Sequence, residues 1–227
     1  GLAQSDEEMK EWLTSNKPNW GSKWQAGDVK YKDLTGEGEV TPGASTLENH
    51  GDLKRIGNNS PRYRVGLNLD AAWKGIDFSI FFQGVLKRDW MFDAGDPYFW
   101  GAGSGMWQAA CFEEHMDYWT PENTDAYYPK PYFNETKNQQ AQDAYMQKAS
   151  YLRCKNIQLG YTLPTHITEK AGISNCRIYL SCDNLFTITG LSSVYDPEVF
   201  GSYDGYGTSG KTYPLQRTIS VGVNLNF

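Results

Sequence analysis

The last residues of the chain alternate between apolar and polar side chains without a break. In residues 216–227 every second position from Ile219 to Phe227 is apolar, and the positions between them are small or polar. A period of two predicts a β-strand with one apolar face and one polar face. We therefore expect a half-apolar strand that runs to the final residue, Phe227.

Four earlier segments show the same alternation, at residues 62–73, 76–87, 149–162 and 175–186. The first two are separated only by Lys74 and Gly75, which predicts a tight antiparallel hairpin. In the segment 149–162 the apolar parity changes by one residue near Lys155 and Asn156. Such a change indicates a β-bulge, where one strand carries an extra residue.

The connections between these strands alternate between short and long. We divide the chain into a long connection at 1–61, a hairpin at 62–87, a long connection at 88–148, a hairpin at 149–187, a long connection at 188–215 and the final strand at 216–227. Bacterial outer-membrane barrels keep short turns on the periplasmic side and long loops outside. This order predicts that the three long connections are extracellular and that the final strand ends in the periplasm.

The polar faces of the predicted strands carry many charged and amide side chains. A β-sandwich core could not hold these groups without partners, whereas a wide, water-filled lumen can. The apolar faces would then meet lipid. The residues that we expect to face the lumen are Arg64, Asn68, Asp70, Asp77, Gln83, Arg177 and Asp183.

Composition agrees with a membrane barrel but does not decide the matter. Hydrophobic residues make up only 39% of the chain, aromatics reach 15%, and the mean hydropathy is −0.62. Lipid-facing and lumen-facing residues alternate in a barrel strand, so its mean hydropathy is low. A secreted carbohydrate-binding β-sandwich would have a similar composition. No run approaches the roughly 18 apolar residues of a transmembrane helix.

Five strands are too few to close a transmembrane barrel, which needs about eight. The opening residues lack a basic start and an apolar run, so they do not form a signal peptide. We therefore expect the chain to be mature, processed or cut from a longer protein.

Charge and cysteine usage exclude other classes. The net charge is −6 and no Lys/Arg cluster occurs, so nucleic acid is not an expected partner. None of the four cysteines forms a CxxC pair, and we interpret them as small apolar residues on strands. If the segments around Cys154 and Cys182 pair, these two thiols would lie nearly opposite each other, which leaves a disulfide open.

A series of short segments resembles one family. The segments are GDVKYKDL at 27–34, IGN at 56–58, the strands at 63–69 and 78–84, WTPEN at 119–123, SYLR at 150–153, LGYTLP at 159–164, DNLF at 183–186, YDPE at 195–198 and the final run at 213–227. In this order they resemble the C-terminal part of the SusC/RagA-type TonB-dependent transporters of the Bacteroidetes outer membrane. The resemblance covers nearly the whole chain.

The resemblance implies a fold and a set of partners. The family fold is a barrel of about 22 strands with a plugged lumen, and this all-β, antiparallel segment would supply its last five strands. The implied function is import of oligosaccharides or peptides, with a SusD-like lipoprotein as an extracellular lid. Energy would come through TonB, which would contact the N-terminal part outside this chain. The remainder of the barrel, the plug and membrane lipid would be further neighbours.

The long connection 88–148 is rich in aromatic side chains, which suit a surface that stacks on sugar rings. Those near the glycines at 101–105 are the best candidates, because glycine permits close approach of a ligand. The alternative is that the aromatics form a small core of the connection or an interface with the lid protein. The substrate-binding candidates are Trp90, Tyr98, Phe99, Trp100 and Trp107.

A short acidic segment resembles a calcium loop. Asp33, Glu37 and Glu39 offer carboxylates, but Ala44 stands where the loop would need its final glutamate. We therefore expect a turn without metal and keep these three residues only as a weak cation candidate. No cofactor is predicted.

Nothing in the sequence predicts an enzyme. The three histidines are scattered, and no HExxH or GxSxG motif occurs. We predict a non-catalytic importer segment of the outer membrane, with a secreted β-sandwich carbohydrate-binding module as the alternative.

Overall fold

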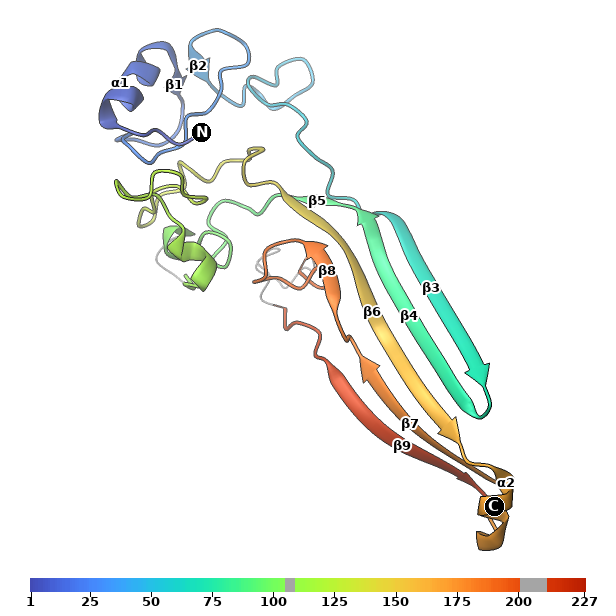
Figure 1. The fold of residues 1–227 in the computed structure, drawn as a ribbon. Coiled ribbons are helices and arrows are strands. Elements are labelled where there is room, and N and C mark those ends of the chain that lie inside the picture. Colours follow the sequence, from blue (N-terminus) through green and yellow to red (C-terminus); the bar gives the residue numbers. More distant parts are fainter. Residues whose placement is uncertain (105–108, 201–211) are drawn as a thin grey trace. The chain divides into compact units, whose positions relative to one another are not determined.

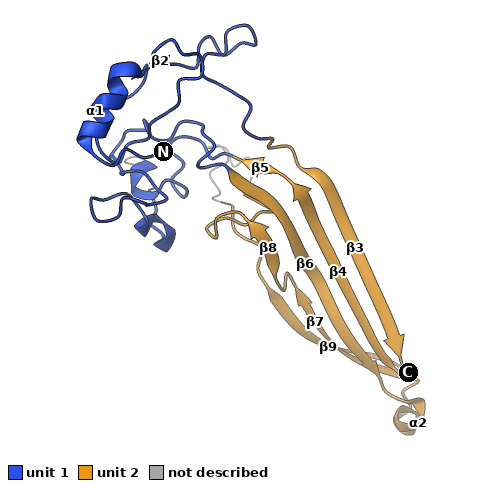
Figure 2. Ribbon diagram, turned by 45° about the horizontal axis from the view of Figure 1, so that its top comes forward, with its two compact units in different colours: residues 1–57, 91–146, 201–211 blue, residues 58–90, 147–200, 212–227 orange. Residues whose placement is uncertain are grey.

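The computed structural model describes residues 1–104, 109–200 and 212–227 of the chain. These residues fall into two compact units, coloured blue and orange in Figure 2. Unit 1 contains Gly1–Gly57 and Met91–Met146, and unit 2 contains Asn58–Trp90, Gln147–Phe200 and Thr212–Phe227. Each unit therefore joins segments that are far apart in the sequence.

Unit 2 is an antiparallel sheet whose long strands lie side by side in the order β3, β4, β6, β7, β9 (Figure 1). Two short strands, β5 and β8, pair with β6, and β3 and β9 form the two edges. The predicted antiparallel segment with five long strands is confirmed, as a sheet that does not close on itself. The strands are β3 (Arg62–Trp73), β4 (Ile76–Lys87), β5 (Asp89–Trp90), β6 (Gln147–Thr162), β7 (Asn175–Asp183), β8 (Thr187–Gly190) and β9 (Thr218–Asn226).

The turn between β3 and β4 consists of Lys74 and Gly75, with φ values of +46° and +83°. Two successive residues with positive φ form the type I′ turn, whose twist matches that of the flanking strands. The turn brings Trp73 opposite Ile76 and sets the register of the whole hairpin.

The predicted β-bulge in β6 is confirmed. Asn156 lies opposite Phe81 and Cys154 lies opposite Phe82, so Lys155 is the extra residue. The bulge restores the apolar parity of β6 on both of its sides, because Cys154 and Ile157 now lie on the same face of the sheet.

The single strand predicted over 175–186 is wrong in its last residues. β7 ends at Asp183, and Asn184 adopts a left-handed conformation with φ +51°. The chain bends there because the Asn184 and Leu185 amides donate to the carbonyls of Lys155 and Cys154 at the bulge. A separate strand, β8, then follows.

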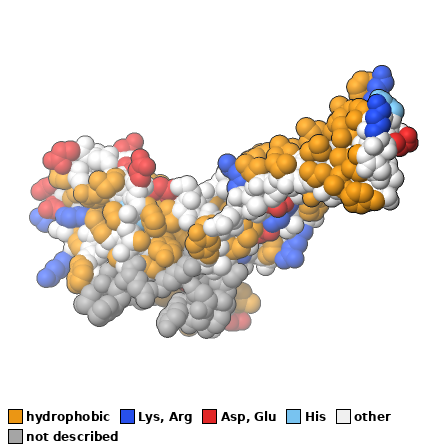
Figure 3. Space-filling model, turned by 90° about the horizontal axis from the view of Figure 1, so that it is seen from below, with side chains coloured by type: hydrophobic (Ala, Val, Ile, Leu, Met, Phe, Trp, Pro, Cys, Tyr) orange, Lys and Arg blue, Asp and Glu red, His pale blue; other side chains and the backbone are white. Residues whose placement is uncertain are grey.

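One face of the sheet is apolar and uncovered by any other described element. Successive strands contribute rows such as Ala71, Phe78, Leu159, Leu180 and Val221. Leu159, Leu180 and Val221 in this row are 51%, 49% and 74% exposed. Hydrophobic side chains run as a band along the sheet in Figure 3. An exposed apolar sheet face is suited to lipid rather than water.

Three buried cysteines, Cys154, Cys176 and Cys182, lie in the strands of this sheet, and all four cysteines are free thiols. Cys182 lies opposite Ile157, whereas Cys154 stands beyond the bulge and pairs with Phe82 on its other side. The register of β6 and β7 therefore does not place the two thiols in the opposed positions that the sequence left open.

Unit 1 is built mainly from irregular chain around a few short elements. These are α1 (Asp6–Ser15), the parallel pair β1 (Lys17–Pro18) and β2 (Glu39–Val40), and the 3₁₀ helices η1 (Gly101–Ser104) and η2 (Glu113–Met116). In unit 2, α2 (Thr165–Thr168) and η3 (Glu169–Ala171) connect β6 to β7. No helix in the described ranges is both long and apolar enough to cross a membrane.

The helix α1 was not predicted, although its start carries a sequence signal. The Ser5 hydroxyl accepts the Glu8 amide at 3.1 Å, and the Glu8 carboxylate accepts the Gln4 amide at 2.5 Å. A serine followed by a glutamate three residues later is the capping-box pattern of a helix N-terminus. The segment 1–61 is thus a folded part of unit 1 over most of its length.

Candidate functional site

Aromatic side chains of the connection 88–148 form the core of unit 1. Phe99 stacks on Phe92 with 4.8 Å between ring centroids, and the ring of Trp100 meets it edge-on at the same distance. Tyr128 and Tyr145 close the cluster at 5.8 and 6.4 Å from Phe99. Phe99 is only 1% exposed, so its ring has almost no surface to offer a ligand.

The other predicted substrate-binding residues are placed differently. Trp100 lines a cavity, as described below, and the half-buried Tyr98 packs edge-on against Phe112. Trp90 belongs to β5 in unit 2, where it meets Phe200. Trp107 lies outside the described residues. Tyr98, Phe99 and Trp100 are therefore part of unit 1, whereas Trp90 is part of unit 2.

A cavity of about 310 Å³ opens beside Trp100 within unit 1. This volume lies at the lower end of the range for small-molecule sites and suits one sugar ring or one amino-acid side chain. Its wall is mainly apolar, with several aromatic and proline side chains. The lining includes Trp100, His115, Tyr128, Pro131, Tyr132 and Gln139.

A second cavity in unit 1, of about 860 Å³, has a more polar wall. Lysines and aspartates alternate there with tyrosine rings. A wall of this kind can hydrogen-bond to hydroxyl, amide or carboxylate groups. Its lining includes Lys30, Tyr31, Lys54, Tyr127, Asp143 and Tyr145.

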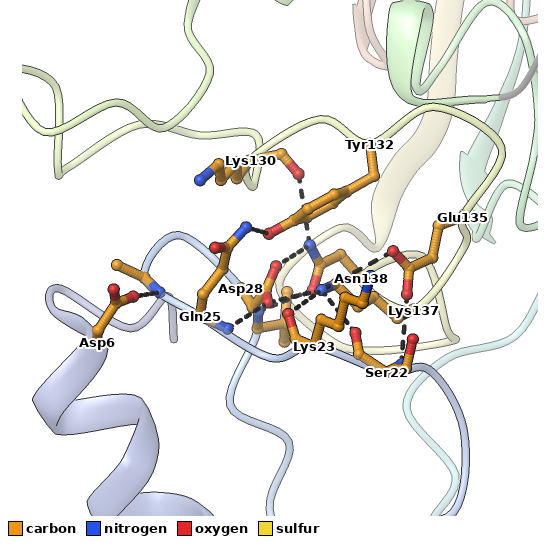
Figure 4. Close-up of polar contacts among 12 residues, drawn as sticks. Asp6, Ser22, Lys23, Gln25, Asp28, Lys130, Tyr132, Glu135, Lys137 and Asn138 are labelled. Atoms are coloured by element: carbon orange, nitrogen blue, oxygen red, sulfur yellow. Dashed lines mark hydrogen bonds and ion pairs between the residues drawn. The ribbon is translucent and has the colours of Figure 1, made fainter.

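A buried ion pair joins the two sequence segments that build unit 1 (Figure 4). The Lys137 ammonium lies 2.9 Å from the Asp28 carboxylate, and both side chains are fully buried. Asn138 donates to Asp28 at 2.9 Å and accepts the Val29 amide at 3.0 Å. Lys137 also donates to the carbonyls of Ser22 and Lys23. Every strongly polar atom of the pair thus has a partner, as a buried charge requires.

Aromatic faces complete the surroundings of Lys137. Its ammonium lies 4.0 Å from the ring centre of Tyr132 and 5.4 Å from that of Trp24. Burial raises the pKa of the Tyr132 hydroxyl, which accepts a hydrogen bond from Gln25 at 2.7 Å. Trp24 follows Lys23 in the loop after α1, so its contact with Lys137 connects that loop to the segment around Lys137.

The acidic segment at Asp33 forms a turn held by its own backbone. The Asp33 carboxylate accepts the amides of Gly38 at 2.8 Å and Gly36 at 2.6 Å, and these hydrogen bonds lower its pKa. Asp52 accepts the Leu34 amide at 2.6 Å from the other side. Among the described residues no group of three or more His, Cys, Asp or Glu side chains is arranged to hold a metal ion.

The seven residues predicted to face the lumen all lie on one face of the sheet. The register places Asn68 in the row of Phe81, Asn156 and Asp183, and places Asp70 two residues further along β3. The register places Arg64, Asp77, Gln83 and Arg177 on this same face of the sheet, and the apolar rows lie on the opposite face.

Two charges of this polar face meet across an intervening strand. Arg177 of β7 forms an ion pair with Asp77 of β4, and it also donates to Gln158 of β6 at 2.9 Å. Gly160 of β6 lies between them. A Cβ atom at Gly160 would meet both the Arg177 guanidinium and the Asp77 carboxylate at 2.5 Å. A side chain at this position would force the two charged groups to shift from their present contact.

A second charged cluster lies where β6 meets the connection 188–215. Arg153 forms ion pairs at 2.8 Å with both Asp196 and Glu198, and its Nε donates to the Thr187 hydroxyl at 2.7 Å. Lys155 adds a third contact to Glu198 at 3.2 Å. This cluster brings together the segments SYLR and YDPE, which are more than forty residues apart.

The resemblance segments also meet in unit 1. Trp119 packs on Gly27, where a Cβ atom would lie 2.5 Å from its ring. The Gly27 carbonyl accepts the Lys130 amide at 3.0 Å.

Neither Lys137 nor Arg153 was singled out from the sequence. The resemblance segments contain Asp28, Arg153 and the two acids of YDPE. The alternation of apolar and polar residues does not show which charged residues form ion pairs. The only usable signal was the presence of charged residues in segments that otherwise predict buried structure.

The fold and the two-faced sheet define a class, a segment of a transmembrane β-barrel. No family model matches the chain. It is 29% identical over 208 residues to TonB-dependent receptor P3 of Formosa agariphila, which covers 88% of this chain and 19% of that relative. TonB-dependent receptor P26 of the same organism is 26% identical over 209 residues, covering 88% and 20%.

A solved structure shows the same fold. A chain of the RagAB peptide importer in its closed-closed state superposes with a TM-score of 0.51 at 23% identity, covering 77% of this chain and 18% of that chain. The chain spans about a fifth of the length of the curated relatives it matches.

The family predicted from the sequence segments is therefore confirmed: this chain is a homologue of the TonB-dependent receptors of the outer membrane. The relatives are receptors by name, in keeping with a non-catalytic protein.

Proposed function

We propose that this chain forms part of the wall and extracellular surface of an outer-membrane importer of oligosaccharides or peptides. The observation that supports this most directly is the sheet of unit 2. One of its faces is apolar and exposed, and the other carries charged side chains that form ion pairs. A sheet of this kind fits between lipid and a polar lumen, whereas a β-sandwich module would cover its apolar face with a second sheet.

In this proposal the three long connections, 1–61, 88–148 and 188–215, face the outside. The hairpins 62–87 and 149–187 and the strand 216–227 cross the membrane. The cavity beside Trp100 and the polar cavity lined by Tyr31 and Tyr145 are the places in unit 1 that could hold part of a substrate. Phe99 would support that surface from behind.

The partners follow from the family resemblance. A SusD-like lipoprotein would cover the extracellular side, and TonB would act through the N-terminal part and plug of the full receptor. The neighbour in the structural comparison is a peptide importer by name, so peptides stand beside oligosaccharides as candidate substrates.

The test is genetic and uses the full-length receptor. Deleting its gene should abolish growth on one oligosaccharide or peptide mixture as sole carbon source, and a wild-type copy should restore it. Depleting TonB in the restored cells should remove that growth again. Unchanged uptake of every oligosaccharide and peptide mixture in the deleted strain would contradict the proposal.

A further inference from the structure

Near the open end of the β3–β4 hairpin, Arg64 and Arg88 have no acidic partner in the part of the chain that is described, and the same holds for Arg62 at the start of β3. Arg64 lies on the polar face of β3, in the row of Val85 and Tyr151. Arg88 directly follows β4. The polar-face arginines Arg153 and Arg177, by contrast, each contact a carboxylate. The sheet therefore neutralises some of its arginines and leaves this pair without counter-charge.

Arg88 is held in a fixed orientation. Its guanidinium carbon lies 4.8 Å from the ring centre of Trp90 and 4.7 Å from that of Phe200. The two rings are perpendicular at 5.0 Å, and the Arg88 Nε donates to the Asn59 carbonyl at 3.1 Å. These contacts use the faces of the guanidinium and one of its N–H groups. Its terminal N–H groups have no acceptor among the described residues.

The surroundings of Arg88 include a second positive charge and an unpaired hydrogen-bond donor. Burial lowers the pKa of Arg88, the Tyr151 hydroxyl raises it in part, and the positive charge of Arg64 lowers it again. The Trp90 Nε1–H group is buried and has no hydrogen-bond partner within the described ranges. Like charges and unpaired buried donors are unfavourable unless a ligand meets them.

We propose that Arg88, together with Arg64 and Trp90, binds a carboxylate group of an imported solute. A planar guanidinium with free terminal N–H groups matches the two oxygens of such a group. Arg64 adds charge, and Trp90 adds a donor and an aromatic edge. Because Arg64 lies on the polar face of the sheet, the anion belongs to a solute in the lumen rather than to a lipid. This inference rests on the import function proposed above.

The experiment measures binding to the full-length receptor purified in detergent. Two matched pairs of probes separate the sources of the anion: trigalacturonate against maltotriose, and triglutamate against triglutamine. We expect one anionic probe to bind more tightly than its neutral partner. Arg88→Met should weaken that binding about 10- to 100-fold, because a charge-assisted hydrogen bond to the anion is lost. Arg88→Lys should retain part of it, since the charge remains but the planar fork does not.

Arg217→Met is the matched control, because Arg217 is an exposed arginine before β9. It should leave the binding of every probe unchanged. Equal binding of the anionic probe by wild type, Arg88→Met and Arg64→Met would overturn the inference. So would a wild-type receptor that does not prefer either anionic probe.

The inference and the import function fail separately. Anion binding that depends on Arg88 in a receptor whose deletion changes no uptake would contradict only the import function. Uptake that depends on the receptor but shows no anion preference would contradict only the inference.

Discussion

Arg153 and Asp196 form an ion pair with 2.8 Å between Nη2 and Oδ1, and their side chains are only 4% and 6% exposed. The other carboxylate oxygen of Asp196 accepts the Leu215 amide at 3.0 Å. Asp196, which lies in the connection 188–215, therefore contacts both β6 and the last residue of that connection. A buried carboxylate with a guanidinium on one oxygen and an amide on the other leaves little freedom to the chain around it.

We predict that Arg153→Met destabilises the end of β6 and the connection that it holds. Removing one partner of a buried pair costs about 3–5 kcal/mol, because the remaining charges keep their desolvation penalty. In the full-length receptor the midpoint of the heat-induced shift in gel mobility should fall, and protease should cut within 188–215. The midpoint of Arg153→Lys should lie between those of Arg153→Met and the wild-type receptor. An unchanged midpoint with an intact connection would contradict the role assigned to the pair.

Lys137→Met should loosen unit 1, because it leaves the Asp28 carboxylate fully buried without its counter-charge. The expected cost is again about 3–5 kcal/mol. Adding Asp28→Asn should recover part of this loss, since the two positions interact and their effects are not additive. Hydrogen exchange of the segments 20–31 and 130–139 measures the effect. Lys23→Met is the control, because only the backbone carbonyl of Lys23 contacts Lys137. A double variant less stable than Lys137→Met would speak against the pair.

Two neighbouring positions of β9 test which face meets lipid. Val221 lies on the apolar face and is 74% exposed, and Ser220 lies on the polar face. Val221→Arg should lower the amount of assembled receptor in the outer membrane, since an arginine facing lipid costs about 2–4 kcal/mol near the bilayer centre. Ser220→Arg should be tolerated. The amounts of the two variants are compared by immunoblot of outer-membrane fractions. A lower amount of Ser220→Arg than of Val221→Arg would mean that the polar face, rather than the apolar face, meets lipid.

The turn at Asp33 should not depend on a metal ion. Its carboxylate is occupied by the amides of Gly36 and Gly38. We expect the rate of proteolytic cleavage within 33–40 to be the same with calcium and with a chelator, and to increase in Asp33→Ala under both conditions. The pKa of Asp33 is lowered, so its contribution to stability is present above the ordinary carboxyl pKa and is lost as the pH falls below it. Slower cleavage in calcium than in the chelator would contradict this prediction and support a cation site at Asp33.

Unit 1 should lose stability at alkaline pH. Burial raises the pKa of four tyrosines, Tyr31, Tyr128, Tyr132 and Tyr145, above the ordinary value of 10.0. A raised pKa in the folded state means that the unfolded chain releases its protons first, so stability is complete below about pH 10 and falls as the pH rises further. Ultraviolet absorbance of tyrosinate and hydrogen exchange should change together. Tyr128→Phe should shift this loss to higher pH, and an unaltered profile would show that Tyr128 does not contribute.

The alternation of apolar and polar residues determined the sheet of this protein. It located all five long strands, the hairpin at Lys74 and Gly75 and the bulge at Lys155, because side chains in a strand point to opposite faces with a period of two. The same parity placed the predicted lumen residues on one face. The family followed from short segments that keep their order along the chain.

Only the tertiary structure decided how the long connections fold and which polar groups meet. The residues 1–61 and 88–148 have no regular period, so nothing local indicates that most of them build one unit around Phe99 and Lys137. Asp28 and Lys137, and likewise Arg153 and Asp196, are distant in sequence, and a charge carries no information about the partner that will neutralise it. A period of two is a local property of each strand, whereas the pairing of buried charges depends on where the whole chain returns.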